Sequence, residues 1–166
     1  MSPAATSAAK EKALIEGSIK LVGHHVGEGA DGGLHVETTI TCQGRTFSGA
    51  SSGPAVLPDR LKPSALATIR ALGACLEDSG VVAASRRALL LDDVIEVSVG
   101  DVPVAVVMIT ASEKSKSTPV VAAYPLVGMS DLAIIVATLQ ATTRIVSHWI
   151  AGGHRSAPAE KQERPQ

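Results

Sequence analysis

The stretch LHVETTITCQGR, residues 34–45, decides the fold class of this chain. Residues expected on a buried face alternate along it with residues expected on a wetter face. This period of two is that of a β-strand with one face packed on a core. Gln43-Gly44 then predicts a tight hairpin into a further strand over residues 45–51, which ends at the turn Ser51-Ser52-Gly53-Pro54. The expected buried positions are Leu34, Val36, Thr38, Ile40 and Cys42, and the wetter ones are His35, Glu37, Thr39, Thr41 and Gln43.

The segments around this hairpin predict a first structural unit over residues 12–80. Upstream, apolar residues in an extended pattern predict a strand over residues 12–22, closed by Gly23 and by the glycine-rich turn 27–33. Downstream, apolar residues at helical spacing predict a helix from Ser64 to Asp78, with Gly80 as its stop. The order is therefore strand, strand, strand, helix.

Residues 81–151 predict a second unit with the same order. Strands are expected over residues 88–99, 103–111 and 118–127, with polar turns between them. Ser130 is a favourable N-cap for a helix to Ile150, and Gly152 supplies a stop.

Short matches between the two halves indicate an internal duplication. Ser64-x-Leu66-Ala67-x-Ile69-x-Ala71 corresponds to Ser130-x-Leu132-Ala133-x-Ile135-x-Ala137. A three-stranded sheet covered by one helix leaves a flank unburied, and a second copy can cover it. We therefore expect an α+β fold of tandem βββα units related by a pseudo-twofold, with the helices packed on antiparallel sheets.

The two ends of the chain carry no large apolar periodicity. Residues 1–11 and 152–166 are rich in small, polar or charged residues, so we expect both to be disordered. The N-terminus has no basic and apolar signal pattern, which favours a cytoplasmic protein. Residues 132–150 are strongly apolar, but Gln140, Arg144 and His148 recur along them, so we expect a buried helix and no membrane partner.

Composition limits the class of function. The chain has 166 residues, 45% hydrophobic and 19% charged, with a formal net charge of −1. Its 15 Lys and Arg residues are balanced by 16 Asp and Glu residues, and only 2% of the residues are aromatic. Because nucleic-acid proteins need a basic surface or stacking side chains, we expect no nucleic-acid partner. An RNA-binding fold of similar element order would also need a basic helix start, whereas Ser130-Asp131-Leu132 is acidic.

Residues able to bind metal or perform catalysis are scattered. His24 and His25 are neighbours, so a regular strand sends them to opposite faces and they cannot share one metal ion, and His35 lies across a glycine loop. Cys42 and Cys75 each stand alone, which favours two buried thiols in the reduced state. We expect no metal and no cofactor.

The sequence does not support acid–base or nucleophilic catalysis either. Asp92 and Asp93, close to Glu96, are the acidic cluster of the sequence, but neighbouring strand residues point apart, which favours a solvated face. Ser51-Ser52-Gly53 is not a nucleophile elbow, and no histidine followed by a carboxylate stands out as its base. We therefore expect no enzyme.

The segment Ala50-Ser51-Ser52-Gly53-Pro54, between a strand and an Ala-rich helix, resembles the C-terminal regulatory domain of 2-isopropylmalate synthases. In that family a strand ends in a glycine-rich turn before a helix; here a serine takes the place of its first glycine, and residues 56–62 intervene before the helix. The resemblance covers about half of the chain and implies paired βββα units with small ligands such as amino acids between them. It assigns ligand binding to Ser51, Ser52 and Gly53 and, from the second half, to Gly128.

Two further features predict contact between copies of the chain. Residues 104–109 are apolar on both strand faces, so we expect Val106 and Met108 at an interface. Ala133, Ala137 and Ala141 form an i, i+4, i+8 row that suits close helix packing, and we assign it to the same role.

These observations favour a non-catalytic small-molecule-binding or regulatory domain protein that forms a homo-oligomer. A purely structural assembly protein and a small enzyme with an unrecognised site remain as alternatives.

Overall fold

The structure is a computed structural model that describes residues 19–81, 86–128 and 130–153. Its elements follow one another as two similar series along the chain. The first consists of β1 (Lys20–Glu28), β2 (Leu34–Cys42), β3 (Arg45–Gly53), the short 3-10 helix η1 (Asp59–Leu61) and α2 (Lys62–Asp78). The second consists of β4 (Ala88–Val99), β5 (Val102–Glu113), β6 (Lys116–Pro125) and α4 (Ser130–Gly153).

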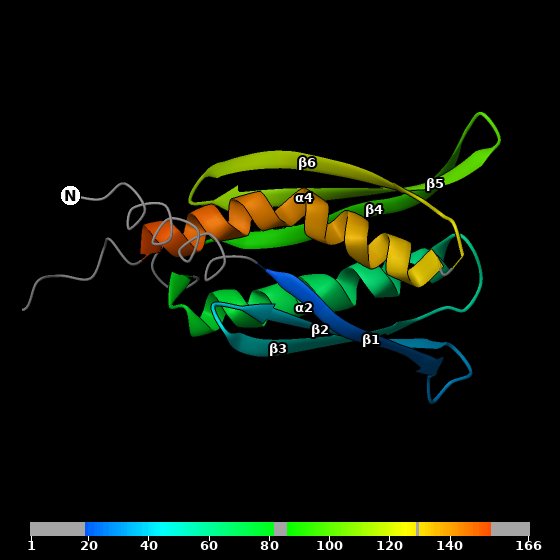
Figure 1. Cartoon of the computed structure of the whole chain (residues 1–166), viewed down its shortest axis with the longest axis horizontal. Coiled ribbons are helices and arrows are strands. Elements are labelled where there is room, and N and C mark those ends of the chain that lie inside the picture. The colour runs from blue at the N-terminus through cyan, green and yellow to red at the C-terminus, as the bar shows by residue number, and fades with distance from the viewer. Residues whose placement is uncertain (1–18, 82–85, 129, 154–166) are drawn as a thin grey trace, which may run out of the picture.

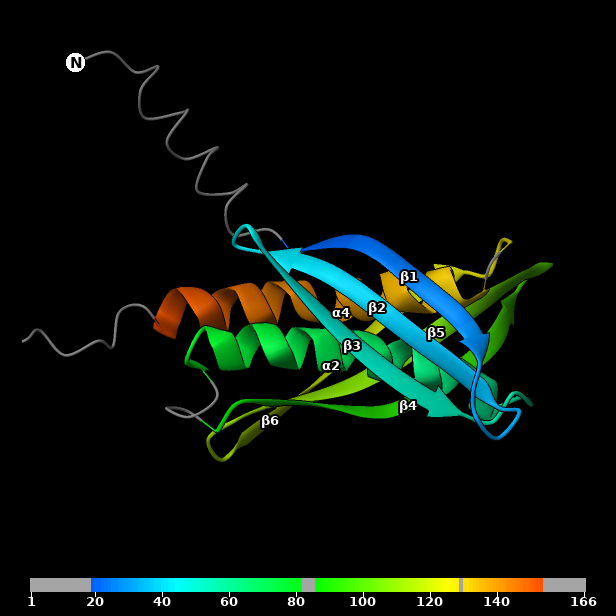
Figure 2. The ribbon, with the colours of Figure 1, turned by 90° about the horizontal axis from the view of Figure 1, so that it is seen from below.

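In the residues that the structure describes, each unit combines one antiparallel sheet with one long α-helix. The strand orders are β1-β2-β3 and β4-β5-β6, so every connection within a sheet is a hairpin. Helices α2 and α4 lie side by side between the two sheets and run in the same direction (Figures 1 and 2). The predicted α+β fold of tandem βββα units is therefore confirmed, and the direction of the helices agrees with a pseudo-twofold between the units.

The alternating stretch of residues 34–45 forms β2 and its turn as predicted. Leu34, Val36, Thr38, Ile40 and Cys42 are all buried. The chain then reverses at Gln43 and Gly44, with φ of 52° and 72°, so that Cys42 pairs with Arg45. Two successive positive φ angles are those of the type I′ hairpin turn, which matches the twist of the strands it joins.

Helix α2 packs very closely on the first sheet because Gly49 of β3 has no side chain. A Cβ atom at Gly49 would overlap the carbonyl oxygen of Ala67 and the amide nitrogen of Ala71 on the helix. The helix ends at Asp78, and Gly80 follows with a φ of 68°, which confirms the predicted stop.

Helix α4 serves two apolar clusters. One face carries Ile135 and Leu139 into a cluster with Ile40 and Cys42 of the first sheet and Leu72 of α2. The adjacent face carries residues into a second cluster, between α2 and the second sheet, whose members include Leu61, Ala65, Val107, Ile109, Ile134 and Ala137. Apolar contact between the units is therefore the main core of the protein.

Several predicted boundaries are wrong. Strand β1 does not end at Gly23 but continues to Glu28, so His24 and His25 lie within a strand. Helix α4 runs through Gly152 to Gly153, so Gly152 is no stop and residues 152 and 153 are not a disordered tail. Many helices end at a glycine with a positive φ, as α2 does before Gly80. The remaining residues of the two predicted tails, and residues 12–18 of the first predicted strand, lie outside the described residues.

The strongly apolar sequence of α4 raises the question of whether this helix could cross a membrane. In the part of the chain that the structure describes, no helix has the length and apolar character needed to cross a membrane.

Candidate ligand-binding hollows

The predicted ligand-binding residues Ser52 and Gly53 line a hollow at the end of β3. Its volume is about 410 Å³, and the loop between β1 and β2 forms its other wall. Ser52 Oγ lies 2.8 Å from Nδ1 of His35, its partner in the strand register, so this hydroxyl is already engaged. The lining residues are Gly29, Ala30, Asp31, Gly33, Leu34, Ser52, Gly53 and Pro54.

Ser51 and Gly128, the other two predicted binding residues, do not join this hollow. Ser51 is buried on the inner face of the first sheet, because alternate strand residues point to opposite faces. Gly128 has a φ of 81° and precedes α4 by two residues. A glycine adopts this conformation without strain, and Gly128 is not among the residues that line the hollow.

A second hollow lies between the two units at the end where both helices begin, and we call it the inter-unit hollow. Its volume is about 340 Å³. Apolar side chains form most of its wall, and three polar residues, Arg60, Glu96 and Ser130, complete it. Leu57, Leu61, Pro103 and Leu126 supply the apolar part. Apolar walls with a few polar groups are typical of small-molecule sites.

A buried polar cluster supports the inter-unit hollow. Asp131, in the first turn of α4, is only 7% exposed. One of its carboxylate oxygens accepts a hydrogen bond from Ser64 Oγ at 2.8 Å, and the other lies 3.1 Å from Nη2 of Arg60. The Asp131 carboxylate therefore restricts the orientation of the Arg60 guanidinium, because it is buried and forms an ion pair with it. The sequence pattern did not predict this cluster, since Arg60 lies in the short helix η1, outside the predicted strands and helices.

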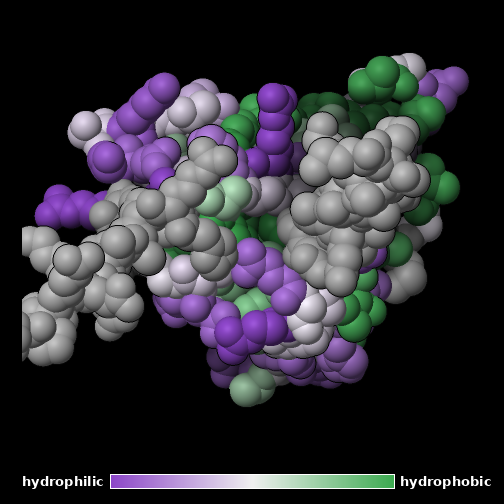
Figure 3. All heavy atoms as spheres, turned by 60° about the vertical axis from the view of Figure 1, so that its left-hand side comes forward, coloured by the Kyte–Doolittle hydropathy of each residue, from purple (hydrophilic) through white to green (hydrophobic). Residues whose placement is uncertain are grey.

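A third hollow, of about 400 Å³, lies at the other end of α4 between that helix and strands β5 and β6. We call it the β5–α4 hollow. It is lined by Ala111, Glu113, Lys116, Thr118, Arg144, Ile145, His148 and Trp149. Figure 3 brings the end of the molecule where α4 finishes toward the viewer and shows hydrophilic side chains there with smaller hydrophobic areas between them.

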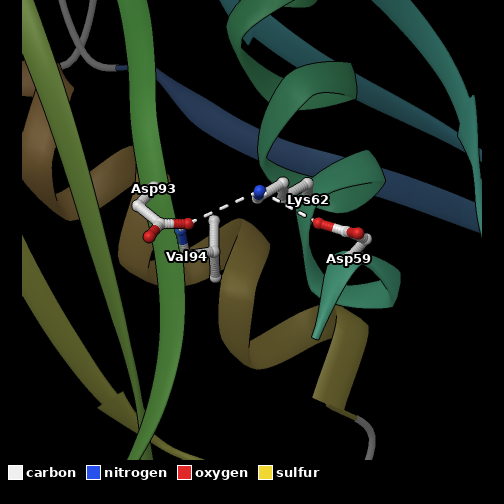
Figure 4. Close-up of polar contacts among 4 residues, drawn as sticks. All are labelled: Asp59, Lys62, Asp93 and Val94. Atoms are coloured by element: carbon white, nitrogen blue, oxygen red, sulfur yellow. Dashed lines mark hydrogen bonds and ion pairs between the residues drawn. The ribbon is translucent and has the colours of Figure 1, made fainter. Parts of the chain in front are cut away.

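The acidic cluster of the sequence is divided by the fold. Asp92 accepts a hydrogen bond from Thr110 at 2.8 Å, whereas Asp93 lies 3.7 Å from Nζ of Lys62 at the start of α2 (Figure 4). Lys62 also contacts Asp59 at 3.0 Å, and these carboxylates, Asp59 first, raise the pKa of its ammonium group. Asp92 and Asp93 therefore have different partners, and Asp93 helps to join the units.

The potential metal ligands are dispersed in the described part of the chain, whereas the two thiol groups lie together. Among the described residues, no three His, Cys, Asp or Glu side chains come together as metal ligands. Cys42 of β2 and Cys75 of α2 are both free and buried, in agreement with the prediction. The sequence did not predict that they meet: a hydrogen bond between them lowers the pKa of Cys42, and that bond together with burial raises the pKa of Cys75.

The predicted interface residues fall into two groups. Ala133 and Ala137 are buried within one chain, and Ala141 packs beside Ala137 in the cluster between the units. The alanine row thus serves close packing, as expected, but inside the chain and not between chains. Val106 and Met108 lie on the outer face of the second sheet, the face opposite to α2 and α4, and both are half-buried.

No family model matches the chain, and a search of curated proteins finds no match.

Proposed function

We propose that the chain is a non-catalytic, small-molecule-binding regulatory protein that works as a homo-oligomer, with its ligand in the inter-unit hollow. The observation that carries the proposal is the position of that hollow at the contact between units. A ligand that touches Arg60 of the first unit and Glu96 of the second changes the free energy of their association. Regulation by a small molecule requires such a differential contact.

An apolar amino acid fits the side chains of the hollow. Arg60 offers a cation for a carboxylate, Glu96 offers an anion for an ammonium group, and the leucine and proline side chains offer an apolar wall. This ligand class agrees with the resemblance to the regulatory domain of 2-isopropylmalate synthases. The resemblance places the ligand near Ser51 to Gly53, whereas the proposal places it in the neighbouring inter-unit hollow.

Calorimetric titration with L-leucine, L-valine and L-methionine tests this assignment. We expect saturable binding of at least one of them, and much weaker binding of 4-methylpentanoate, which lacks the ammonium group. Glu96→Gln is expected to weaken binding, while Glu77→Gln, an exposed change on α2, leaves it unchanged. An absence of binding by all three amino acids, or equal binding to both variants, contradicts the proposed ligand.

The outer face of the second sheet supports the proposal of a homo-oligomer. Cross-strand rows on this face contain Ile95, Val106 and Ala123, and then Met108 and Val121. Val121 is 61% exposed. On β4 the second row continues to Asp93, whose carboxylate lies 3.7 Å from Nζ of Lys62. The other members of the two rows are uncharged, and exposed apolar patches of this kind usually mark interfaces. The proposed occupant is a second copy of the chain.

Sedimentation velocity at micromolar protein concentration tests the oligomer. We expect at least a dimer, and we expect Val121→Glu to dissociate it while the circular dichroism spectrum stays the same. Val22→Glu is a matched control, because Val22 is 60% exposed but lies on the first sheet. A monomeric wild-type chain, or dissociation by both variants, contradicts this interface. A dimer with no amino-acid binding would instead favour the structural alternative.

A further inference from the structure

The β5–α4 hollow is built from two strand pairs and one helix face. On the strands, Ala111 lies opposite Thr118 and Glu113 opposite Lys116, so these four side chains share one face of the sheet. On the helix, Arg144 and His148 are four residues apart, as are Ile145 and Trp149, so they form two adjacent rows. The helix therefore contributes one polar row and one apolar row to the hollow.

The charges in this hollow do not balance. Glu113 is paired with Arg87, whose Nε lies 2.8 Å from the Glu113 carboxylate, and Arg87 is the main cause that lowers the pKa of this carboxyl group. Among residues 19–81, 86–128 and 130–153, no carboxylate lies within ion-pair distance of Lys116 or Arg144. The positive charges of Lys116 and Arg144 are therefore available to pair with a ligand or with another group outside the described residues.

The apolar base of the hollow is held in place before any ligand arrives. Trp149 is buried, and Arg87 lies 5.8 Å from the centre of its indole ring and donates a hydrogen bond to its carbonyl oxygen at 3.0 Å. Ala111 is buried beside it, and Ile145 is half-buried. A fixed apolar surface lowers the entropic cost of binding, since few side chains must be ordered.

We propose that the β5–α4 hollow binds a small organic acid, with its apolar body on Ala111, Ile145 and Trp149 and its carboxylate between Lys116 and Arg144. The hollow has the volume of a small-molecule site. An inorganic anion would leave the apolar base uncovered, and a neutral apolar molecule would leave the two cations unpaired. A carboxylate on an apolar body satisfies both. This site is separate from the inter-unit hollow and does not depend on the function proposed for it.

Trp149 makes the test direct, because it is the single tryptophan of the chain. The probe is 3-phenylpropanoate, titrated while the tryptophan fluorescence is recorded, and the comparison ligand is its neutral analogue 3-phenylpropanamide. We expect a saturable change with the acid and binding of the amide weaker by about tenfold or more, since the neutral amide cannot form ion pairs with Lys116 and Arg144. Equal binding of the two ligands, or no fluorescence change with the acid, overturns the proposal.

Variants of the two cationic residues test whether the acid binds in the β5–α4 hollow. The double variant with Lys116→Gln and Arg144→Gln is expected to bind the acid about tenfold or more weakly and the amide unchanged. Lys20→Gln, which removes a positive charge from an exposed position on the first sheet, is expected to bind like the wild type. Both cations sit on exposed positions, so the melting temperature of the double variant should stay close to that of the wild type. A double variant that folds and retains wild-type affinity for the acid contradicts the site.

Discussion

Arg60 of the first unit and Asp131 of the second form an ion pair where both helices begin, with Nη2 of the arginine 3.1 Å from Oδ2 of the aspartate. Ser64 of α2 donates to the other carboxylate oxygen at 2.8 Å. The internal repeat aligns Ser64-Ala65 with Ser130-Asp131, so the acidic residue is present in one unit only. The two units are therefore joined through a carboxylate that only the second unit carries.

Removal of this carboxylate is expected to loosen the contact between the units. Asp131→Ala leaves Ser64, which is buried, and Arg60 without their acceptor, and a buried donor that loses its partner costs about 1–3 kcal/mol. The loss is measured as the change in free energy of unfolding in urea. Glu77→Ala, at an exposed position of α2, should change it by no more than about 0.5 kcal/mol. Equal effects of the two substitutions would contradict a structural role for the pair.

Two glycines of the first unit predict opposite responses to the same substitution. Gly49→Ala forces a methyl group into the backbone of α2 at Ala67 and Ala71, and overpacking of this kind costs about 1–3 kcal/mol or more. Gly73→Ala adds a methyl group to α2 where nothing lies within 4 Å of it, and it should stabilise the protein by about 0.5–1 kcal/mol. Thermal unfolding of both variants measures the difference. A stable Gly49→Ala protein would show that α2 sits farther from β3.

The sequence predicts the strands and helices well because each is encoded by a local pattern. The alternation of residues 34–43 and the spacing of Leu66, Ile69, Leu72 and Leu76 need no distant contact to be recognised. The polar cluster at Asp131 is different, since it depends on the contact between two units and on Arg60 in the short helix η1, which no periodic pattern signals. The β5–α4 hollow likewise joins residues of a hairpin and a helix about thirty residues apart, which no local pattern brings together.

The alanine row of α4 illustrates the same limit. Small residues four apart predict a close helix contact, and the structure has one, but spacing alone cannot distinguish a partner in the same chain from one in another chain.

The ion pair between Arg87 and Glu113 predicts a dependence of stability on pH. The guanidinium lowers the pKa of Glu113 from its ordinary value of 4.5 in the folded state. Because the folded pKa is the lower one, the stabilisation is complete above the unfolded pKa and is lost as the pH falls through the folded pKa. Glu113→Gln should therefore have a lower melting temperature than the wild type near neutral pH, and the gap should narrow below about pH 4. A gap that stays constant over this range would contradict the pair.

Ala137 is expected to be intolerant of charge because it is completely buried between α4, α2 and the second sheet. Ala137→Glu places a carboxylate among Ala65, Val107 and Ile109, where no cation is available in the cluster. An uncompensated buried charge costs about 3–5 kcal/mol, a large part of the stability of a domain of this size. The matched control is Ala151→Glu, the same substitution at an exposed position of the same helix. Circular dichroism melting should show a large loss of stability for Ala137→Glu and a small one for Ala151→Glu. Any change in oligomeric mass should follow from unfolding, since the alanine is enclosed by its own chain. A well-folded Ala137→Glu protein that dissociates would instead place the alanine row between chains.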